Sequence, residues 1–499
     1  MLQMKQLTDD LLEQTVQSIT STYRPRYHLL PPNGWINDPN GFCRFDHLYH
    51  LFYQYNPFGV TNKLMYWGHS TSSDLAKWSY EGIALSPDQP YDVKGAFSGT
   101  AIERDGQLLL MYTGVSEDEN GETRQAQCLA YGNKEFTKHL ANPVISSKQI
   151  PTDCRVEDFR DPKIWEENGV YYCLAIAADL KGFGKLLLFK SMDTEHWEFV
   201  SVALSGEDME LGSLWECPDY FKLGDREVIL ISTVNANPRG AKFHNKFSAV
   251  WITGKFDLQK GIFIAEKWDQ LDDGTDFYAP QTTNGLNGKR IMIAWQQSWE
   301  RNIPSADLGH NWAGQMTLPR ELELINGEIC QKPAIDLSHY YSATVVHKNV
   351  KITAQRCLDG VSGGIAYLRL SADLSHCSSM TIRLYKSETE ETVLIIDKAE
   401  ERIVLDRSHS GFQITGAEMV PGASKRCVAS LAGLKAESIT LDIYLDSGSI
   451  EVFCAETGRC LTSRVYPEFL GEEITFEANG EAVISIEEHK IDMEQSGGR

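Results

Sequence analysis

The sequence lacks the features of a membrane protein or a nucleic-acid-binding protein. No stretch approaches the roughly 18 consecutive apolar residues of a transmembrane helix, so we expect no membrane partner. Basic residues are outnumbered, with 47 Lys and Arg against 69 Asp and Glu, which gives a formal net charge of −22. Because nucleic acids and anionic lipids bind basic surfaces, this charge predicts that neither is a partner. It leaves a neutral small molecule open as a substrate.

Signals for secretion and for cross-linking are also missing. The chain opens MLQMKQLTDDLLEQ, without the apolar segment of a signal peptide, and it contains no N-x-[ST] glycosylation site. Its 11 cysteines include no C-x-x-C pair. We therefore expect buried free thiols rather than a disulfide framework, and a cytoplasmic location. A signal peptide removed from the natural protein would make it secreted instead.

Helical periodicity is scarce and confined to the N-terminus. Residues 7–20 are predicted to form a helix within an N-terminal extension of residues 1–23. After Pro25, short runs rich in Tyr, Phe, Val, Ile and Trp alternate with turns of Gly, Pro, Asn and Asp. This alternation is typical of an all-β protein.

A weak internal repeat organises the larger part of the chain. Apolar runs begin at residues 49, 108, 171, 226 and 289, and a short polar motif precedes each: WINDPNG, FSGT, FRDP, WECPD and YAPQ. A spacing of 55–63 residues fits about four strands with their turns. Five such units predict a five-bladed β-propeller over residues 24–335, which would bring the motifs together at its axis. A large sandwich or barrel with incidental spacing is the alternative.

A second domain follows a short linker. Residues 331–342 carry a proline and polar residues, and beyond them short strands recur every 8–15 residues. This spacing predicts a β-sandwich over residues 343–492. No motif of the propeller type occurs in it, so we expect it to bury apolar surface against the propeller in a structural role.

Three carboxylates in the repeated motifs are candidates for catalysis. Asp38 lies in N-D-P-N-G, Asp161 in R-D-P and Glu216 in W-E-C-P. Each also has an interpretation without a function: the Asp38 motif as a simple turn, Arg160 and Asp161 as a surface charge pair, and Glu216 as a solvated side chain. Arg160 beside Asp161 should keep that carboxylate ionised, whereas the apolar neighbours of Glu216 favour a protonated acid. Two facing carboxyl groups, one ionised and one protonated, are the machinery of glycoside hydrolysis.

Eight ordered motifs resemble glycoside hydrolase family 32, the family of invertases, fructan hydrolases and sucrose-6-phosphate hydrolases. The resemblance runs from about Tyr23 to Glu323 and continues weakly at LDIYLDSGSIEVF. It implies a five-bladed propeller followed by a sandwich, a retaining β-fructofuranosidase activity, a small sugar substrate, and no metal or cofactor. The motifs are WINDPNG, FYQYNP, WGHSTSSDLAKW, FSGT, FRDP, WECPD, DFYAPQT and WAGQMTLPREL.

The resemblance also implies residue roles. Asp38 matches the nucleophile, Glu216 the general acid/base and Asp161 the transition-state stabiliser. Trp67 and Trp295 could equally be core residues. Many members carry a tryptophan where this chain has Asn62, which bears on the apolar cover of the fructose site. The positions that match substrate-binding residues are Trp35, Asn37, Gln54, Trp67, Phe97, Ser98, Arg160, Tyr278 and Trp295.

Several functions within and outside the family remain open. We expect sucrose as the substrate, with sucrose 6-phosphate or short fructans as alternatives and a non-catalytic fructoside-binding protein as a remote one. Sucrose is favoured because few basic residues lie near the motifs, and Lys63 is the candidate contact for a phosphate. The acidic stretches 116–122 and 271–276 lack the spacing of calcium loops and are expected to be solvated turn tips.

Overall fold

The computed structural model describes residues 19–432, 437–469 and 471–494. The helix predicted over residues 7–20 lies outside these residues except for its last two positions, which are not helical. The short helices are α2 (Gly206–Met209), α3 (Pro304–Asp307), η1 (Ser147–Gln149), η2 (Val156–Asp158), η3 (Leu286–Gly288) and η4 (Ser338–Tyr340). Within the described part of the chain, no helix is long and apolar enough to cross a membrane.

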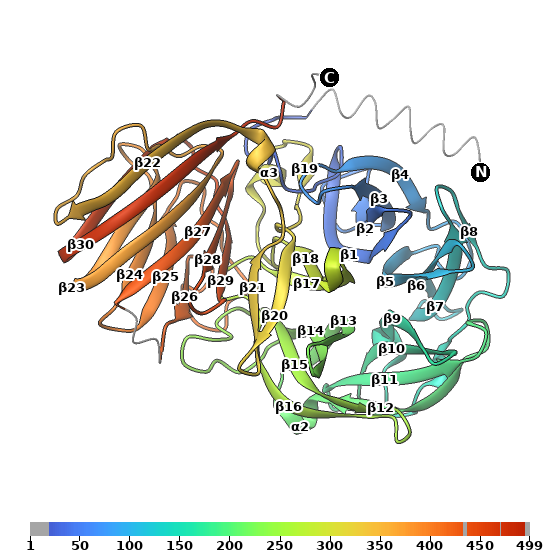
Figure 1. The fold of residues 1–499 in the computed structure, drawn as a ribbon. Helices are drawn as coiled ribbons and strands as arrows, with labels where there is room; N and C mark the ends of the chain where they lie inside the picture. The colour runs from blue at the N-terminus through green and yellow to red at the C-terminus, as the bar shows by residue number, and fades with distance from the viewer. Residues whose placement is uncertain (1–18, 433–436, 470, 495–499) are drawn as a thin grey trace.

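Five antiparallel sheets arranged in a ring confirm the predicted propeller (Figure 1). Each of the first four blades takes its four strands in chain order. The strands of these blades are β1 (Gly34–Phe45), β2 (Leu48–Asn56), β3 (Tyr66–Ser72), β4 (Ser79–Leu85); β5 (Gly95–Arg104), β6 (Gln107–Glu117), β7 (Thr123–Gly132), β8 (Phe136–Lys138); β9 (Arg160–Glu167), β10 (Val170–Ala178), β11 (Gly184–Ser191), β12 (Glu198–Ser205); and β13 (Leu214–Leu223), β14 (Arg226–Val234), β15 (Phe247–Asp257), β16 (Ile262–Gln270).

The ring closes through a segment from late in the chain. The short strand β19 (Trp312–Ala313) adds to the first blade parallel to β1, pairing Gly34 with Trp312 and Trp35 with Ala313. This pairing joins the segment before the last two strands of the fifth blade to the first blade, and it involves Trp35 of the first motif. The fifth blade is β17 (Tyr278–Asn284), β18 (Arg290–Trp295), β20 (Arg320–Ile325) and β21 (Glu328–Pro333).

The recurrent apolar runs form the second strand of each blade, which explains why they are hydrophobic throughout. In β10, Cys173 and Ala175 pack into the core shared with the second blade, whereas Leu174 and Ile176 pack into the core shared with the fourth. A strand covered on both faces reads as a continuous apolar run rather than as an alternating one. The blades are therefore joined by successive apolar cores.

The predicted sandwich is built around two long strands. The first half of β23 (Ala366–Lys386) pairs with β27 and its second half with β24, while β30 (Glu473–Ile491) runs along the whole of its other side. Because both long strands belong to two layers, the pairing continues from one layer into the other. The remaining strands are β22 (Tyr341–Ile352), β24 (Glu391–Asp397), β25 (Arg402–His409), β26 (Arg426–Ser430), β27 (Ser438–Asp446), β28 (Ser449–Cys454) and β29 (Cys460–Arg464).

The acidic stretch 271–276 is not a solvated turn, so that prediction is wrong. Asp272, Asp273 and Asp276 are each at most 5% exposed and lie between the two domains. The carboxylate of Asp276 pairs with Arg301 of the propeller and Arg407 of the sandwich. Asp272 and Asp273 have arginine partners as well, so each carboxylate is buried together with positive charge. The domain boundary therefore contains a charged layer that the sequence pattern did not reveal.

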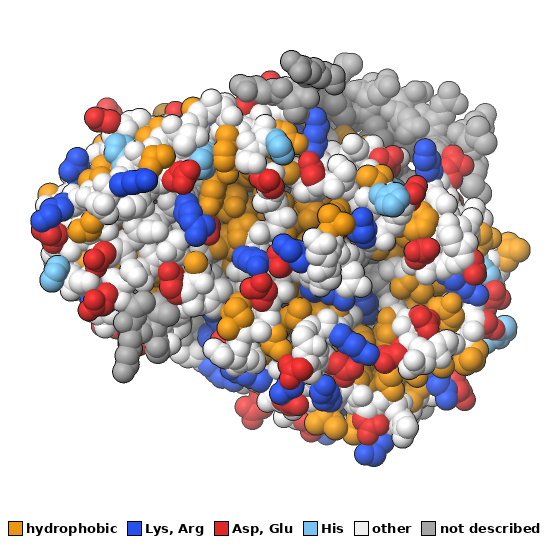
Figure 2. All heavy atoms as spheres, in the orientation of Figure 1, with side chains coloured by type: hydrophobic (Ala, Val, Ile, Leu, Met, Phe, Trp, Pro, Cys, Tyr) orange, Lys and Arg blue, Asp and Glu red, His pale blue; other side chains and the backbone are white. Residues whose placement is uncertain are grey.

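Apolar residues from both domains accompany this layer. Tyr27 and Leu318 of the propeller side pack in one buried cluster with Tyr444 and Phe453 of the sandwich. The cysteines are free as predicted; Cys357 is exposed, Cys330 is half-buried and the others are buried. On the face shown in Figure 2, Lys and Arg are interspersed with Asp and Glu, and the described residues there form no continuous basic area.

Candidate active site

The repeated motifs lie on the innermost strand of each blade, and each of these strands carries a pairing irregularity at its motif. The strand gains one residue relative to its partner, as in a β-bulge, which turns side chains out of the regular alternation. The same irregularity at the same phase of all five blades aims the motif residues at the ring axis. The irregularities fall between Ile36 and Pro39, Phe97 and Gly99, Arg160 and Lys163, Glu216 and Asp219, and Tyr278 and Gln281.

Side chains from other strands bind the backbone amides at three of these bulges. Asp161, Cys217 and Ala279 have positive φ angles of 59°, 48° and 51°, a conformation that costs about 1 kcal/mol or more for a residue other than glycine. The amide of Asp161 donates to Thr113 Oγ1 at 2.9 Å, and the amide of Cys217 donates to Asp161 Oδ2 at 2.9 Å. The amide of Ala279 donates to Ser232 Oγ at 3.0 Å. These bonds hold the strained residues in place.

The three predicted carboxylates lie together at the axis. Cys217 Sγ is 3.5 Å from Asp38 Oδ2 and 3.6 Å from Asp161 Oδ2, so one thiol contacts two carboxylates. Asp38 Oδ2 also accepts a hydrogen bond from Ser98 Oγ at 2.7 Å. Among the described residues, Asp38 Oδ1 is buried without a hydrogen-bond partner. One oxygen of Asp38 is thus held in place while the other is free to react.

Glu216 is held by a different set of groups. Its Oε1 accepts from Arg160 Nη2 at 3.0 Å, and its Oε2 accepts from the hydroxyl of Tyr278 at 2.6 Å. Arg160 also binds Asp158 Oδ1 at 3.2 Å, whereas its Nε lies 3.8 Å from Asp161 Oδ2. Of the three predicted carboxylates, Arg160 therefore makes its shortest contact with Glu216 rather than with the neighbouring Asp161.

Burial shifts the ionisation of two of the carboxyl groups. Desolvation raises the pKa of Asp38, and hydrogen bonds from Ser98 and Asn37 offset part of the rise. Desolvation raises the pKa of Asp161 to about 7, although the adjacent Arg160 charge acts to lower it. Burial thus outweighs the ion pair with Arg160 in setting the direction of this shift, and the pKa of Asp161 is raised rather than lowered. Burial also raises the pKa of the Cys217 thiol, which keeps it protonated as a donor to the carboxylates.

Most of the predicted substrate-binding residues lie around the carboxylates. Trp35 Nε1 donates to Asn37 Oδ1 at 2.7 Å, which joins the first motif internally. Gln54 Nε2 donates to the carbonyl of Ala96, directly before Phe97. Phe97 is partly exposed, whereas Trp35 is 8% exposed at the edge of an apolar cluster that also contains Tyr278. These residues can supply an aromatic surface and amide groups to a sugar.

Two predicted residues do not reach the site. Trp67 is fully buried in the core between the first two blades, where its Nε1 donates to the carbonyl of Phe97 at 3.1 Å. Trp295 is also fully buried and packs behind Trp35. The prediction that they contact the sugar is wrong, because tryptophans without exposed surface cannot stack on it. Trp67 instead supports Phe97, and Trp295 supports Trp35. Asn62 is exposed in the loop of residues 57–64, whose Val60 packs against the apolar cluster that contains Trp35.

Sequence reasoning missed two residues of the site. Trp299 is partly exposed and stacks on Trp35 with ring centroids 6.0 Å apart and an interplanar angle of 23°. Cys217 bridges the carboxylates, although it was considered only as an apolar neighbour of Glu216. The sequence does place both Trp295 and Trp299 around a turn after the fifth apolar run. Nothing in it shows which of the two tryptophans faces the site.

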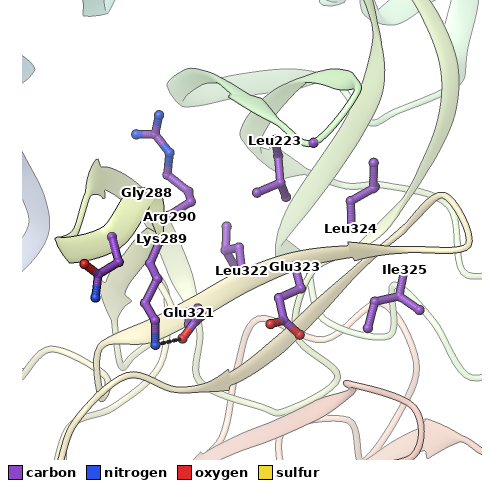
Figure 3. A pocket seen from close by; sticks show the side chains of 11 residues that line it. Leu223, Gly288, Lys289, Arg290, Glu321, Leu322, Glu323, Leu324 and Ile325 are labelled. Carbon is purple, nitrogen blue, oxygen red and sulfur yellow. Dashed lines mark hydrogen bonds and ion pairs between the residues drawn. The ribbon is translucent and has the colours of Figure 1, made fainter.

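A groove elsewhere on the propeller has different chemistry. It encloses about 450 Å³ between the β13–β14 turn, the β17–β18 turn and β20, at the ends of these strands away from the carboxylates. Lys289 and Glu321 in it pair at 2.7 Å, as the dashed line in Figure 3 shows. Of the other charged residues that line the groove, Glu323 pairs with Lys332 and Arg290 lies over the ring of Phe221. In the described residues, no group of three or more His, Cys, Asp or Glu is arranged to hold a metal ion.

Comparison with known proteins gives consistent matches over both domains. Residues 28–333 match the model described as "Glycosyl hydrolases family 32 N-terminal domain", and residues 336–492 match "Glycosyl hydrolases family 32 C terminal". A sucrose-6-phosphate hydrolase of Zymomonas mobilis is 33% identical over 471 residues, 90% of this chain and 88% of that protein. A raffinose invertase of Escherichia coli is 31% identical over 499 residues, 97% of this chain and 98% of that protein. The structure of a Bombyx mori β-fructofuranosidase has a TM-score of 0.84 at 29% identity, covering 98% of each chain.

Proposed function

The chain belongs to glycoside hydrolase family 32 and is a β-fructofuranosidase, and we propose that it hydrolyses sucrose with retention of the β configuration at fructose. The observation that carries this proposal is the pair of carboxyl groups at the axis, one with a free oxygen and the other held by a guanidinium and a phenol. A retaining hydrolase needs one carboxylate as nucleophile and one carboxyl as acid and then base.

The first chemical step uses Asp38 and Glu216. Asp38 Oδ1 attacks the anomeric carbon of fructose, and Glu216 transfers its proton to the glycosidic oxygen, which leaves with glucose. Ser98 holds the second oxygen of Asp38 and so orients the attacking one. Arg160 and Tyr278 fix the carboxyl of Glu216 on the leaving-group side. The products are a fructosyl ester of Asp38 and free glucose.

The second step returns the enzyme to its starting state. Glu216 takes a proton from water, the hydroxide attacks the fructosyl carbon, and the ester bond to Asp38 breaks. Two inversions at one carbon leave the β configuration unchanged. Asp161 is placed to bind fructose hydroxyl groups, and its contacts with the Cys217 amide and thiol hold it beside Asp38.

The substrate is proposed as sucrose rather than sucrose 6-phosphate. A phosphate needs free Arg or Lys groups at its binding point. Three other basic residues of the propeller are engaged elsewhere: Arg301 pairs with Asp276, Lys242 pairs with Asp269, and Arg239 stacks on Trp268. Lys63 remains, exposed in the loop of residues 57–64. Relatives from Zymomonas mobilis and Escherichia coli are named sucrose-6-phosphate hydrolases, which makes the phosphorylated sugar the second candidate.

Competition between the two sugars tests this proposal. We expect sucrose to have the higher kcat/KM and the preference to change little with salt, since a neutral sugar is not attracted by charge. Each sugar is supplied as a competitor of the other at low and high salt, and products are measured by chromatography. A clear preference for the phosphorylated sugar that shrinks as salt rises would overturn the proposal. Lys63→Gln should then abolish that preference, while Lys348→Gln, an exposed lysine of the sandwich, should not.

The pH profile supplies a second prediction. Asp38 must be ionised to attack, so kcat/KM should fall on the acidic side as Asp38 becomes protonated. The hydroxyl of Ser98 donates to the Asp38 carboxylate and lowers its pKa. Ser98→Ala should therefore raise the pKa of Asp38 and move the acidic limb to higher pH by about one unit. Ser70→Ala, which removes a buried hydroxyl bonded to Tyr53 instead, should leave the limb in place. An unmoved limb in the Ser98 variant would contradict the assignment of Asp38.

The location of the protein is proposed as the cytoplasm. The free state of the cysteines supports this proposal, since buried unpaired thiols are typical of reducing compartments.

A further inference from the structure

A loop of the sandwich domain reaches the rim of the catalytic propeller. It lies between β25 and β26, and its residues 413–419, called here the sandwich loop, contact two separate propeller segments. These segments are residues 244–246, before β15, and residues 300–302, after the fifth blade's β18. On the loop side these hydrogen bonds are made mainly by backbone groups, so they depend on the shape of the loop more than on its side chains.

The first segment binds the loop through its backbone. The amide of Lys246 donates to the carbonyl of Ala417 at 2.8 Å, and the amide of Met419 donates to the carbonyl of His244 at 2.8 Å. Asn245 and Glu418 form an isolated β-bridge between these two bonds. The loop therefore continues the sheet pattern beside residues 244–246.

The second segment binds the same loop from the other side. Asn302 Nδ2 donates to the carbonyl of Gln413 at 3.0 Å, and the amide of Thr415 donates to Asn302 Oδ1 at 2.8 Å. Arg301 Nε donates to the carbonyl of Gly416 at 3.3 Å. The loop thus joins two segments that are more than 50 residues apart in the sequence.

The joined segments are flanked by aromatic residues that contact the site. Lys246 Nζ pairs with both carboxylate oxygens of Glu300 at 2.6 Å each, across the two segments. Trp299, directly before Glu300, stacks on Trp35. Phe247, directly after Lys246, packs edge-on against Tyr278 with ring centroids 5.8 Å apart.

The loop itself enters the apolar cluster of the site. Ala417 is 8% exposed and packs in the same buried cluster as Trp35, Cys217 and Tyr278. Tyr278 in turn binds Glu216, the group that protonates the leaving sugar in the proposed reaction. The two joined segments therefore lie on the leaving-group side of the site.

We infer that the sandwich loop is a positioning element of the active site: by holding residues 244–246 and 300–302 together it fixes the wall that a leaving sugar contacts. This inference rests on the proposed function, because the leaving-group side is defined by Glu216. It extends the role expected for the sandwich from burial of surface to control of how well a large leaving group is accepted. The fructose side of the site, built from the first three blades, has no contact with the loop in the described hydrogen bonds.

Gly416 offers a precise way to disturb this contact. Its φ is +102°, and a Cβ there would lie 2.2 Å from the carbonyl oxygen of Glu300. Any side chain at this position must therefore push the sandwich loop away from residues 300–302. Gly422 is a matched control in the same connection between β25 and β26. Its φ is +85°, and a Cβ there would meet nothing within 4 Å. The two substitutions to alanine impose similar backbone strain and differ in steric contact.

The experiment compares two substrates of different leaving-group size. Sucrose releases glucose, whereas methyl β-D-fructofuranoside releases methanol, which is too small to reach the Trp299 and Glu300 wall. We expect Gly416→Ala to lower the ratio of kcat/KM for sucrose to that for the methyl fructoside by about tenfold, mainly through KM for sucrose. Gly422→Ala should leave the ratio within about twofold of wild type.

A second variant covers the case in which Gly416→Ala fails to fold. Asn302→Ala removes three hydrogen bonds to the loop without adding volume, and it should lower the same ratio by about threefold or more. An unchanged ratio in Asn302→Ala, or equal changes in the two glycine variants, would overturn the inference. Wild-type protein that hydrolyses neither fructoside would instead contradict the proposed function, so the two failures are distinguishable.

Discussion

Asp38→Asn should lose hydrolysis of sucrose by roughly 10⁴-fold or more while the fold stays intact. The carboxamide is nearly the same size but cannot form the fructosyl ester, so the first step has no nucleophile. Removing this charge also relieves repulsion with Glu216, which contributes to the raised pKa of Asp38. We therefore expect the melting temperature of the variant to equal or exceed that of the wild type.

The measurement is initial-rate hydrolysis of sucrose, with circular dichroism and thermal melting as tests of folding. Asp158→Asn is the control, because Asp158 is a carboxylate beside the site that binds Arg160 at 3.2 Å but has no bond to Asp38 or Asp161 among the described contacts. It should lose about tenfold at most. Near-wild-type turnover by the Asp38 variant would sink the assignment of the nucleophile.

Asp276→Asn should be the most destabilising conservative substitution at the domain boundary, lowering the free energy of unfolding by about 3–5 kcal/mol. The carboxylate is fully buried between Arg301 and Arg407 and accepts the backbone amide of Arg464 at 2.8 Å. A neutral amide leaves two buried guanidinium groups without a counter-charge. It also directs an N–H donor at groups that are themselves donors.

The effect should depend on pH in a defined direction. Burial alone would raise the pKa of Asp276, but the charges of Arg407 and Arg301 outweigh it and hold the pKa below its ordinary value. A lowered pKa in the folded state gives stability that is present above the unfolded pKa and is lost as pH falls through the folded one. The difference between wild type and variant should thus be full near neutral pH and shrink in acid.

Urea unfolding followed by fluorescence, at neutral and acidic pH, tests this prediction. Glu328→Gln is the control, since Glu328 forms an exposed pair with Lys267 at 2.7 Å and 47% side-chain exposure. Its loss should change the free energy of unfolding by no more than about 0.5 kcal/mol. Equal midpoints for the Asp276 variant and the wild type would show that the buried ion pairs do not stabilise the boundary.

The fold could be predicted from the sequence because its signals are local and repeated. The apolar second strands, such as β10, are covered on both faces and so read as uninterrupted hydrophobic runs at a constant spacing. The charged layer around Asp276 could not be predicted in this way. Its partners Arg407 and Arg464 are more than 130 residues away, and a stretch of Asp and Gly has the composition of an exposed turn whether or not arginines cover it.

The sequence predicted which residues form the candidate site better than it predicted how their side chains are oriented. Motif matching selected Asp38, Asp161 and Glu216, and the strand phase explains why they meet. Sequence could not say that Arg160 turns towards Glu216, since that depends on where the bulges aim adjacent side chains. The sequence also could not distinguish a partly exposed tryptophan, Trp299, from a fully buried one, Trp295.

The bulges on the innermost strands separate the chemistry of this protein from its architecture. At the bulges of the first and third blades the pairing skips Asp38 and Asp161 and resumes beyond them, whereas in the fourth blade Glu216 is still paired with Ser232 and the two residues after it are skipped. Asp38 and Asp161 therefore contribute little to strand pairing, and Glu216 pairs with its neighbour strand through its backbone rather than its side chain. A mutation that changes a side chain at a bulge leaves the ladder complete. The reactive side chains of such a ring can therefore be replaced one at a time by mutation. The intermediate variants are inactive but folded, so a new activity does not require a new fold.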